Sequence, residues 1–146
     1  MDSILIVDDE PGIRDVLQEA LGASGYRVDT ASNGLEAVDR IKSGRYDAII
    51  SDLGMPEMDG ERFYETVRDA DPRLAKRIIF VTGDTVSPKS RDFLDATGNR
   101  WLAKPFNILD VEEVVSSLLK RDPLTELVDT SPQENRPTRR YHPSAS

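Results

Sequence analysis

The feature that most constrains the fold is a regular alternation between short apolar runs and longer amphipathic segments. The apolar runs have few polar interruptions, as expected of strands buried on both faces of a sheet. We expect strands at 3–8, 26–31, 46–51, 77–82 and 100–103, and helices at 11–25, 34–44, 61–70, 87–98 and 108–121. Because helices separate the strands, the strands should pair in parallel through right-handed crossovers. The predicted fold is an α/β three-layer α/β/α sandwich around a five-stranded parallel sheet.

The composition divides the chain into a body and a tail. The chain has 146 residues, and a usual domain size of about 100–200 residues predicts one domain. The strand and helix pattern ends near Asp122, so we assign 1–122 to the domain and 123–146 to a tail. The tail holds four of the nine prolines, and its three acidic and three basic residues cancel. A Pro-rich, polar segment without apolar periodicity is expected to be disordered.

Composition also narrows the function. The formal charge of −8, from 27 acidic and 19 basic residues, disfavours direct nucleic-acid binding, which uses a basic surface. The chain has no Cys, and His142 is its only His, which argues against cysteine metal sites, multi-histidine sites and histidine triads. No signal peptide is recognisable, and no apolar run approaches the roughly 18–20 residues of a membrane span. We therefore expect a cytoplasmic protein that relies on carboxylates, hydroxyls and lysine.

Polar side chains occur where four of the five predicted strands end. In an open parallel sheet, ligands bind beyond the carboxyl ends of the strands. The residues at these positions are Asp8 and Asp9 after the first strand, Asp52 after the third, Thr82 at the end of the fourth and Lys104 after the fifth. The sequence therefore predicts that three carboxylates, one hydroxyl and one ammonium group lie at the same edge of the sheet.

Three carboxylates at one edge need compensation. Two unit charges roughly 5 Å apart repel by about 3 kcal/mol at an effective dielectric constant near 20. A Mg²⁺ ion would offset this repulsion, and Mn²⁺ would also suit oxygen ligands. Each residue also has an ordinary structural interpretation: a helix N-cap for Asp8 and Asp9, a turn for Asp52, and a buried strand position for Thr82. A shared site explains why all of them fall at one edge.

The chemistry that this set supports is phosphoryl transfer onto a carboxylate. An aspartate can attack phosphorus and form an acyl phosphate. A metal ion and Lys104 would neutralise charge on the transferred group, and the hydroxyl of Thr82 could bind the product. Asp52 is the best candidate nucleophile because it follows the third strand, beside the Asp8–Asp9 pair.

Four segments carry these residues: ILIVDDE, DAIISDLGMPEMDG, IIFVTGD and WLAKPF. In order and spacing they resemble the signature segments of the response regulator receiver domain of two-component signalling, over about residues 3–121. The resemblance implies a flavodoxin-like sheet with strand order 2-1-3-4-5. It also implies a signalling module that catalyses only its own phosphorylation and dephosphorylation. The phosphoryl donor would be a histidine kinase or a histidine phosphotransfer protein, and the output a downstream protein target or a phosphorylation-dependent homodimer.

The resemblance also assigns roles to individual residues. It makes Asp52 the phosphoacceptor and gives Lys104 the role of pairing with the phosphoryl group. Asp9 would bind Mg²⁺ directly, and Asp8 mainly through water. Asp52 and the backbone carbonyl of Gly54 would be further metal ligands.

A second group of residues would act in switching and in phosphoryl lifetime. Thr82 would turn toward the phosphoryl group, and Trp101 occupies the position of the aromatic switch residue, although a core Trp is an equally good interpretation. Pro105 corresponds to the cis-proline of the family. Gly54 and Asp84, two residues after Asp52 and Thr82 respectively, depart from the common pattern, and we hypothesise that they set the lifetime of the acyl phosphate.

Two other functions fit parts of the sequence. A pseudo-receiver that binds partners without phosphorylation would not need the phosphorylation residues, which are intact here: Asp9, Asp52, Thr82 and Lys104. An aspartate-nucleophile phosphatase of the haloacid dehalogenase type places its nucleophile in a first-strand Asp-x-Asp motif, whereas Asp8 and Asp9 are adjacent here. The segments TGDTVSP and LAKPFNILDVEEVV resemble receivers at the C-terminus of hybrid histidine kinases, so both a stand-alone receiver and a receiver of a hybrid kinase are open.

Overall fold

The computed structural model describes residues 1–55, 58–83 and 87–119. Its strands are β1 (Ser3–Val7), β2 (Arg27–Ala31), β3 (Ala48–Asp52), β4 (Ile78–Thr82) and β5 (Trp101–Ala103). Its helices are α1 (Pro11–Ala23), α2 (Gly34–Ser43), α3 (Gly60–Ala70), α4 (Pro72–Ala75), α5 (Pro88–Thr97) and α6 (Ile108–Leu119). Asp84 and the predicted tail 123–146 lie outside the described residues. Within the described ranges, no helix is both long and apolar enough to cross a membrane.

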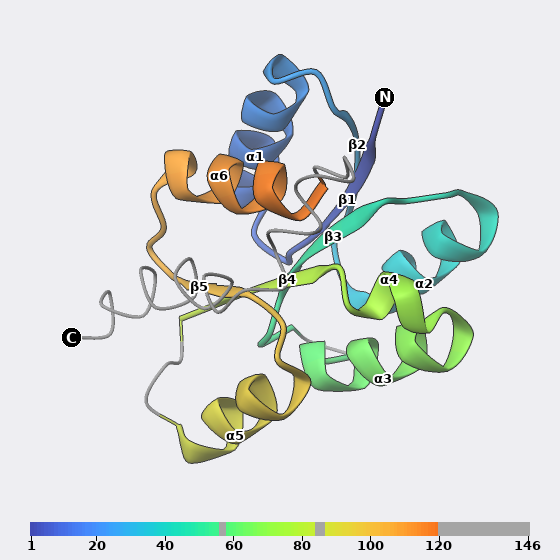
Figure 1. Cartoon of the computed structure of the whole chain (residues 1–146), viewed down its shortest axis with the longest axis vertical. Coiled ribbons are helices and arrows are strands. Elements are labelled where there is room, and N and C mark those ends of the chain that lie inside the picture. Colours follow the sequence, from blue (N-terminus) through green and yellow to red (C-terminus); the bar gives the residue numbers. More distant parts are fainter. Residues whose placement is uncertain (56–57, 84–86, 120–146) are drawn as a thin grey trace, which may run out of the picture.

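The strands form one parallel sheet in the order β2-β1-β3-β4-β5, which confirms the predicted topology. Figure 1 shows α1 and α6 on one face of this sheet and α2, α3 and α5 on the other. The register aligns the carboxyl ends of neighbouring strands: Val7 pairs with Ser51, Asp52 with Val81, and Thr82 with Ala103. The residues that end or follow β1, β3, β4 and β5 therefore share one edge.

The core consists of two apolar layers, one on each face of the sheet. Alternate strand residues such as Leu5, Ile49 and Phe80 pack with residues of α2, α3 and α5. Their neighbours, such as Ile50 and Val81, pack with residues of α1 and α6. All five residues of β3 and of β4 are buried, which explains why the apolar runs in the sequence are nearly continuous.

Most predicted boundaries agree with the structure to within one or two residues, but one strand is shifted and one helix was not predicted. β3 runs from Ala48 to Asp52 instead of 46–51, because Leu53 N–H still donates to Val81 O at 3.0 Å and extends the pairing past Asp52. The short helix α4 was not predicted. Pro72 occupies its first turn, and Asp71 caps it by accepting a hydrogen bond from Leu74 N–H at 3.2 Å.

Two glycines let the segment after β3 fold back closely. Gly60 N–H donates to Leu53 O at 2.8 Å, and a Cβ at Gly60 would lie 2.7 Å from Leu53 Cα and 3.0 Å from Asp52 O. A Cβ at Gly34 would lie 2.9 Å from both the Cβ and the backbone oxygen of Met58. The segment that follows Asp52 is thus held by close contacts that exclude larger residues at Gly34 and Gly60.

We predict that Gly60→Ala lowers the free energy of unfolding by about 1–3 kcal/mol, since the new methyl group meets backbone that cannot move without disturbing β3. Urea unfolding measures this change. The control is Gly22→Ala in α1, where a Cβ would meet nothing within 4 Å and stability should rise or stay the same. An equal loss in both variants would contradict the argument.

Candidate functional site

The carboxyl edge of the sheet brings three of the predicted acidic residues and Lys104 together. Asp8, Asp9 and Asp52 each offer a carboxylate oxygen, and these oxygens lie within 4.8 Å of one another. Lys104 Nζ lies 3.2 Å from Asp8 Oδ2 and 3.3 Å from Asp52 Oδ2. Residues from β3 and from the ends of β1 and β5 therefore meet in one charged cluster.

Local turns hold the two buried carboxylates of this cluster. Asp8 Oδ1 accepts a hydrogen bond from Glu10 N–H at 2.9 Å, and Asp52 Oδ1 accepts one from Gly54 N–H at 3.2 Å. In both residues the other oxygen, Oδ2, faces Lys104. The turn interpretation of Asp52 is therefore compatible with a site. The N-cap interpretation of Asp8 and Asp9 is wrong, because the N-cap of α1 is Glu10, whose side chain makes no capping bond.

Burial sets the electrostatics of the cluster. Asp8 and Asp52 are only 2% and 6% exposed. Burial raises the pKa of Asp8, although the hydrogen bond from Glu10 N–H and the charge of Lys104 both act to lower it. Burial and then the charge of Asp8 raise the pKa of Asp52, against the Gly54 N–H bond and Lys104. Since folding favours the protonated forms of both carboxyls, their ionisation at neutral pH opposes folding.

The pKa of Lys104 is also raised, but for an ammonium group this favours the charged form. Burial lowers the pKa of its ammonium group, but the charges of Asp52 and Asp8 outweigh burial and raise the pKa overall. Lys104 therefore stays charged at neutral pH and supplies one positive charge to three carboxylates. The remaining negative charge, presented by oxygen atoms of Asp8, Asp9 and Asp52 at one edge, fits a hard divalent cation such as Mg²⁺. Asp9 is exposed and so open to an approaching ion.

The other predicted site residues lie on β4, on β5 and directly after Lys104. Thr82 ends β4 and is 2% exposed. Trp101 begins β5, is 3% exposed and packs in the same apolar layer as Phe80 and Leu94, so it occupies a core position in this structure. The Lys104–Pro105 peptide bond is cis.

Two contacts of the cluster were not predicted. Glu10 Oε1 lies 3.3 Å from Lys104 Nζ, and Arg14 Nη1 donates to the backbone oxygen of Asp8 at 2.7 Å. The signal for Glu10 was present as the third acid of the DDE run. The side chain of Glu10 is 58% exposed. From the sequence alone, Glu10 therefore could not be distinguished from an ordinary exposed residue at the start of a helix. Lys104 thus contacts three carboxylates, and Glu10 is the most accessible of them.

Comparison with known proteins gives relatives over most of the chain. The model of the response regulator receiver domain matches residues 4–116. The response regulator MprA of Mycobacterium avium is 35% identical over 118 residues, which are 81% of this chain and 51% of that protein. The response regulator Rre1 of Synechocystis is 33% identical over 120 residues, 82% of this chain and 52% of Rre1. The chain thus spans about half the length of these relatives.

Solved structures share the fold. The chemotaxis protein CheY4 of Vibrio cholerae matches with a TM-score of 0.74 and 36% identity, over 82% of this chain and 99% of CheY4. The response regulator TrrA of Thermotoga maritima, solved in complex with Mg(2+)-BeF, matches with a TM-score of 0.71 and 36% identity, over 82% and 100% of the two chains. The signal receiver domain of a signal transduction histidine kinase from Syntrophus aciditrophicus matches with a TM-score of 0.73 and 31% identity, over 84% of this chain and 95% of that domain.

The family match extends from β1 into α6 and includes every strand of the sheet. The sheet order β2-β1-β3-β4-β5 and the acidic cluster at its carboxyl edge lie within the matched residues. The chain therefore belongs to the response regulator receiver domain family of two-component systems.

Proposed function

We propose that this domain is a phosphorylation-activated signalling receiver that accepts a phosphoryl group from a phosphohistidine onto Asp52. The observation that carries the proposal is the position of Asp52: its carboxylate is buried at the sheet edge, 3.3 Å from Lys104 Nζ and beside two further carboxylates. Phosphoryl transfer needs positive charge around the nucleophile and the transferred group. Lys104 supplies one such charge.

In the proposed reaction a carboxylate oxygen of Asp52 attacks the phosphorus atom and forms a P–O bond. The P–N bond to the donor imidazole breaks, its electron pair goes to the imidazole nitrogen, and the imidazole takes up a proton from solvent. The donor histidine belongs to a histidine kinase or a phosphotransfer protein. The product is an acyl phosphate on Asp52, which hydrolysis returns to the free carboxylate.

The residues around Asp52 would divide the remaining tasks. Asp9, Asp8 through water, Asp52 and the carbonyl of Gly54 would hold Mg²⁺, which when bound would neutralise charge on the phosphoryl oxygens. The ammonium group of Lys104 would bind a phosphoryl oxygen, and the contact with the exposed Glu10 is the one most easily exchanged.

The phosphoryl group would then change the surface of the domain. The hydroxyl of Thr82 would bind it, Trp101 would reorient, and the population would shift toward a form with a different surface at α5 and β5. The packing of α5 supports this part of the proposal, because Leu94 is the one buried residue among Pro88–Thr97 and a helix with few buried contacts moves at low cost. A downstream protein, or a second copy of the chain, would read the change.

We predict that incubation with acetyl phosphate and Mg²⁺ adds one phosphoryl group to the wild-type chain, and that Asp52→Asn abolishes the adduct because the nucleophile is lost. Intact-mass spectrometry measures both. Asp95→Asn, an exposed position on α5, is the matched control and should be phosphorylated normally. Chelation of Mg²⁺ should prevent the adduct in every chain.

Each alternative function gives a different result in this experiment. A wild-type chain that stays unmodified with Mg²⁺ present would contradict the proposal and favour a pseudo-receiver. An adduct that persists in Asp52→Asn would place the nucleophile elsewhere, as in a phosphatase with a first-strand aspartate.

We further propose that Gly54 helps to set the lifetime of the acyl phosphate. Gly54 is exposed, and a Cβ there would meet nothing within 4 Å, so a larger side chain is tolerated beside Asp52. Gly54→Leu should slow dephosphorylation several-fold, because the side chain would screen the acyl phosphate from water. Loss of the adduct over time measures the rate, with Gly22→Leu on α1 as the control.

An unchanged lifetime in Gly54→Leu would contradict this role. The corresponding proposal for Asp84, which lies outside the described residues, is tested by the same assay with Asp84→Leu.

A further inference from the structure

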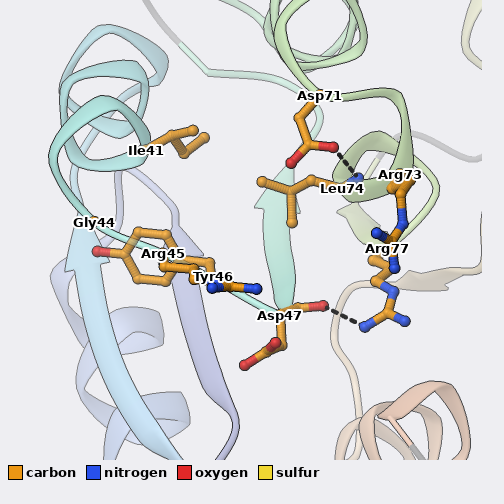
Figure 2. A pocket seen from close by; sticks show the side chains of 9 residues that line it. All are labelled: Ile41, Gly44, Arg45, Tyr46, Asp47, Asp71, Arg73, Leu74 and Arg77. Carbon is orange, nitrogen blue, oxygen red and sulfur yellow. Dashed lines mark hydrogen bonds between the residues drawn. The ribbon is translucent and has the colours of Figure 1, made fainter. Parts of the chain in front are cut away.

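A pocket of about 180 Å³ lies at the opposite edge of the sheet from Asp52. It is formed where β3 and β4 begin, and Arg45, Tyr46, Arg73 and Arg77 are among the residues that line it. Figure 2 shows their side chains around the opening. Since Asp52 ends β3 and each residue of a strand advances roughly 3.3 Å, the length of the strand separates this pocket from the acidic cluster.

Arginines outnumber carboxylates among the residues that line this pocket. Two carboxylates, those of Asp47 and Asp71, accompany the three guanidinium groups. Asp47 Oδ2 accepts a hydrogen bond from Ser3 N–H at 2.8 Å, and Asp71 Oδ1 accepts one from Leu74 N–H at 3.2 Å. Each carboxylate thus has a backbone partner. Over residues 1–55, 58–83 and 87–119, the structure gives neither of them an ion pair with Arg45 or Arg73.

Hydrogen bonds fix two of the lining side chains, those of Arg77 and Tyr46. Arg77 Nη1 donates to the backbone oxygen of Asp47 at 3.3 Å, a contact visible in Figure 2. Tyr46 Oη donates to Asp29 Oδ2 at 2.7 Å. A Cβ at Gly44 would approach the Tyr46 ring to 3.5 Å, so the ring packs closely against the end of α2. Arg45 and Arg73, by contrast, have exposed side chains that can move onto a ligand.

We propose that this pocket binds a small polyanion of the diphosphate class through Arg45, Arg73 and Arg77. A guanidinium group presents a planar fork of N–H donors that matches phosphate oxygens. The chain as a whole carries a net charge of −8. The presence of three arginines around one opening is therefore not explained by a generally basic surface. The volume is below the about 300–1,000 Å³ of typical small-molecule sites, which favours a compact ligand or the diphosphate end of a nucleotide.

The source of the diphosphate determines how Tyr46 would take part. Inorganic pyrophosphate would use the arginines alone. A nucleoside diphosphate would also place its base on the ring of Tyr46, because aromatic side chains stack on bases. Both ligands share the same anion contacts, and the proposal is independent of phosphorylation at Asp52.

The test is a titration of the full chain with pyrophosphate and, separately, with ADP, both without Mg²⁺. Calorimetry gives Kd, and amide NMR locates the site. We expect shifts at residues 44–47 and 71–77, and weaker binding at higher salt. Arg45→Ala and Arg73→Ala should each raise Kd by roughly tenfold, and Arg73→Lys by less, while Arg62→Ala, at an exposed position of α3, should leave Kd unchanged.

Either ligand supports the proposal if it binds here, and the comparison identifies the source. Tighter binding of ADP indicates a nucleoside diphosphate, and equal binding indicates the phosphates alone. Absence of binding by both ligands, shifts confined to the edge at Asp52 and Lys104, or an equal loss in Arg62→Ala would each overturn it. Urea unfolding and phosphorylation of Asp52 in Arg45→Ala and Arg73→Ala show separately that the domain is folded and that its main site is intact.

Discussion

One ammonium group shared among carboxylates from separate parts of the chain is the interaction on which the functional edge of this domain depends. Lys104 reaches Asp8 after β1, Asp52 at the end of β3 and Glu10 at the start of α1. The parallel register brings these residues to one edge, and the buried strands keep them there. Because burial raises the pKa of both Asp8 and Asp52, the sheet holds them where their ionised forms are costly.

This cost gives the site its chemistry. A carboxylate that is buried and crowded by like charge gains from any cation or phosphoryl-bound metal that enters the cluster. A single lysine neutralises only part of the charge. Its ammonium group is shared among the carboxylates of Asp8, Glu10 and Asp52 instead of pairing with one of them. Under the proposed function, Lys104 would exchange these contacts for the phosphoryl group while the sheet stays unchanged.

The sequence was most informative where burial dictates the pattern. Continuous apolar runs in β3 and β4 predicted a parallel sheet buried on both faces, and the polar residues that follow such runs predicted the edge at which Asp8, Asp52 and Lys104 meet. The strand order itself came from the resemblance to the family, because apolar periodicity does not specify which strands are neighbours.

Other features depend on contacts that no local pattern encodes. The contact between Glu10 and Lys104 joins residues 94 positions apart, and Glu10 alone looks like a solvent-exposed helix residue. The burial of Trp101 follows from its packing with Phe80 and Leu94. Arg73, which lines the pocket with Arg45 and Arg77, belongs to α4, and a helix of four residues is too short to produce a periodic signal.

The most direct test of the central claim is the effect of Mg²⁺ on the free energy of unfolding at neutral pH. If repulsion among Asp8, Asp9 and Asp52 makes this edge a cation site, a Mg²⁺ concentration of 100 times Kd should stabilise the wild-type chain by about 2.7 kcal/mol. Without Mg²⁺, Asp52→Asn should be more stable than the wild-type chain. On addition of Mg²⁺, the variant should show little of the stabilisation that the wild-type chain gains. No stabilisation of the wild type, or an equal gain in both chains, would contradict the account.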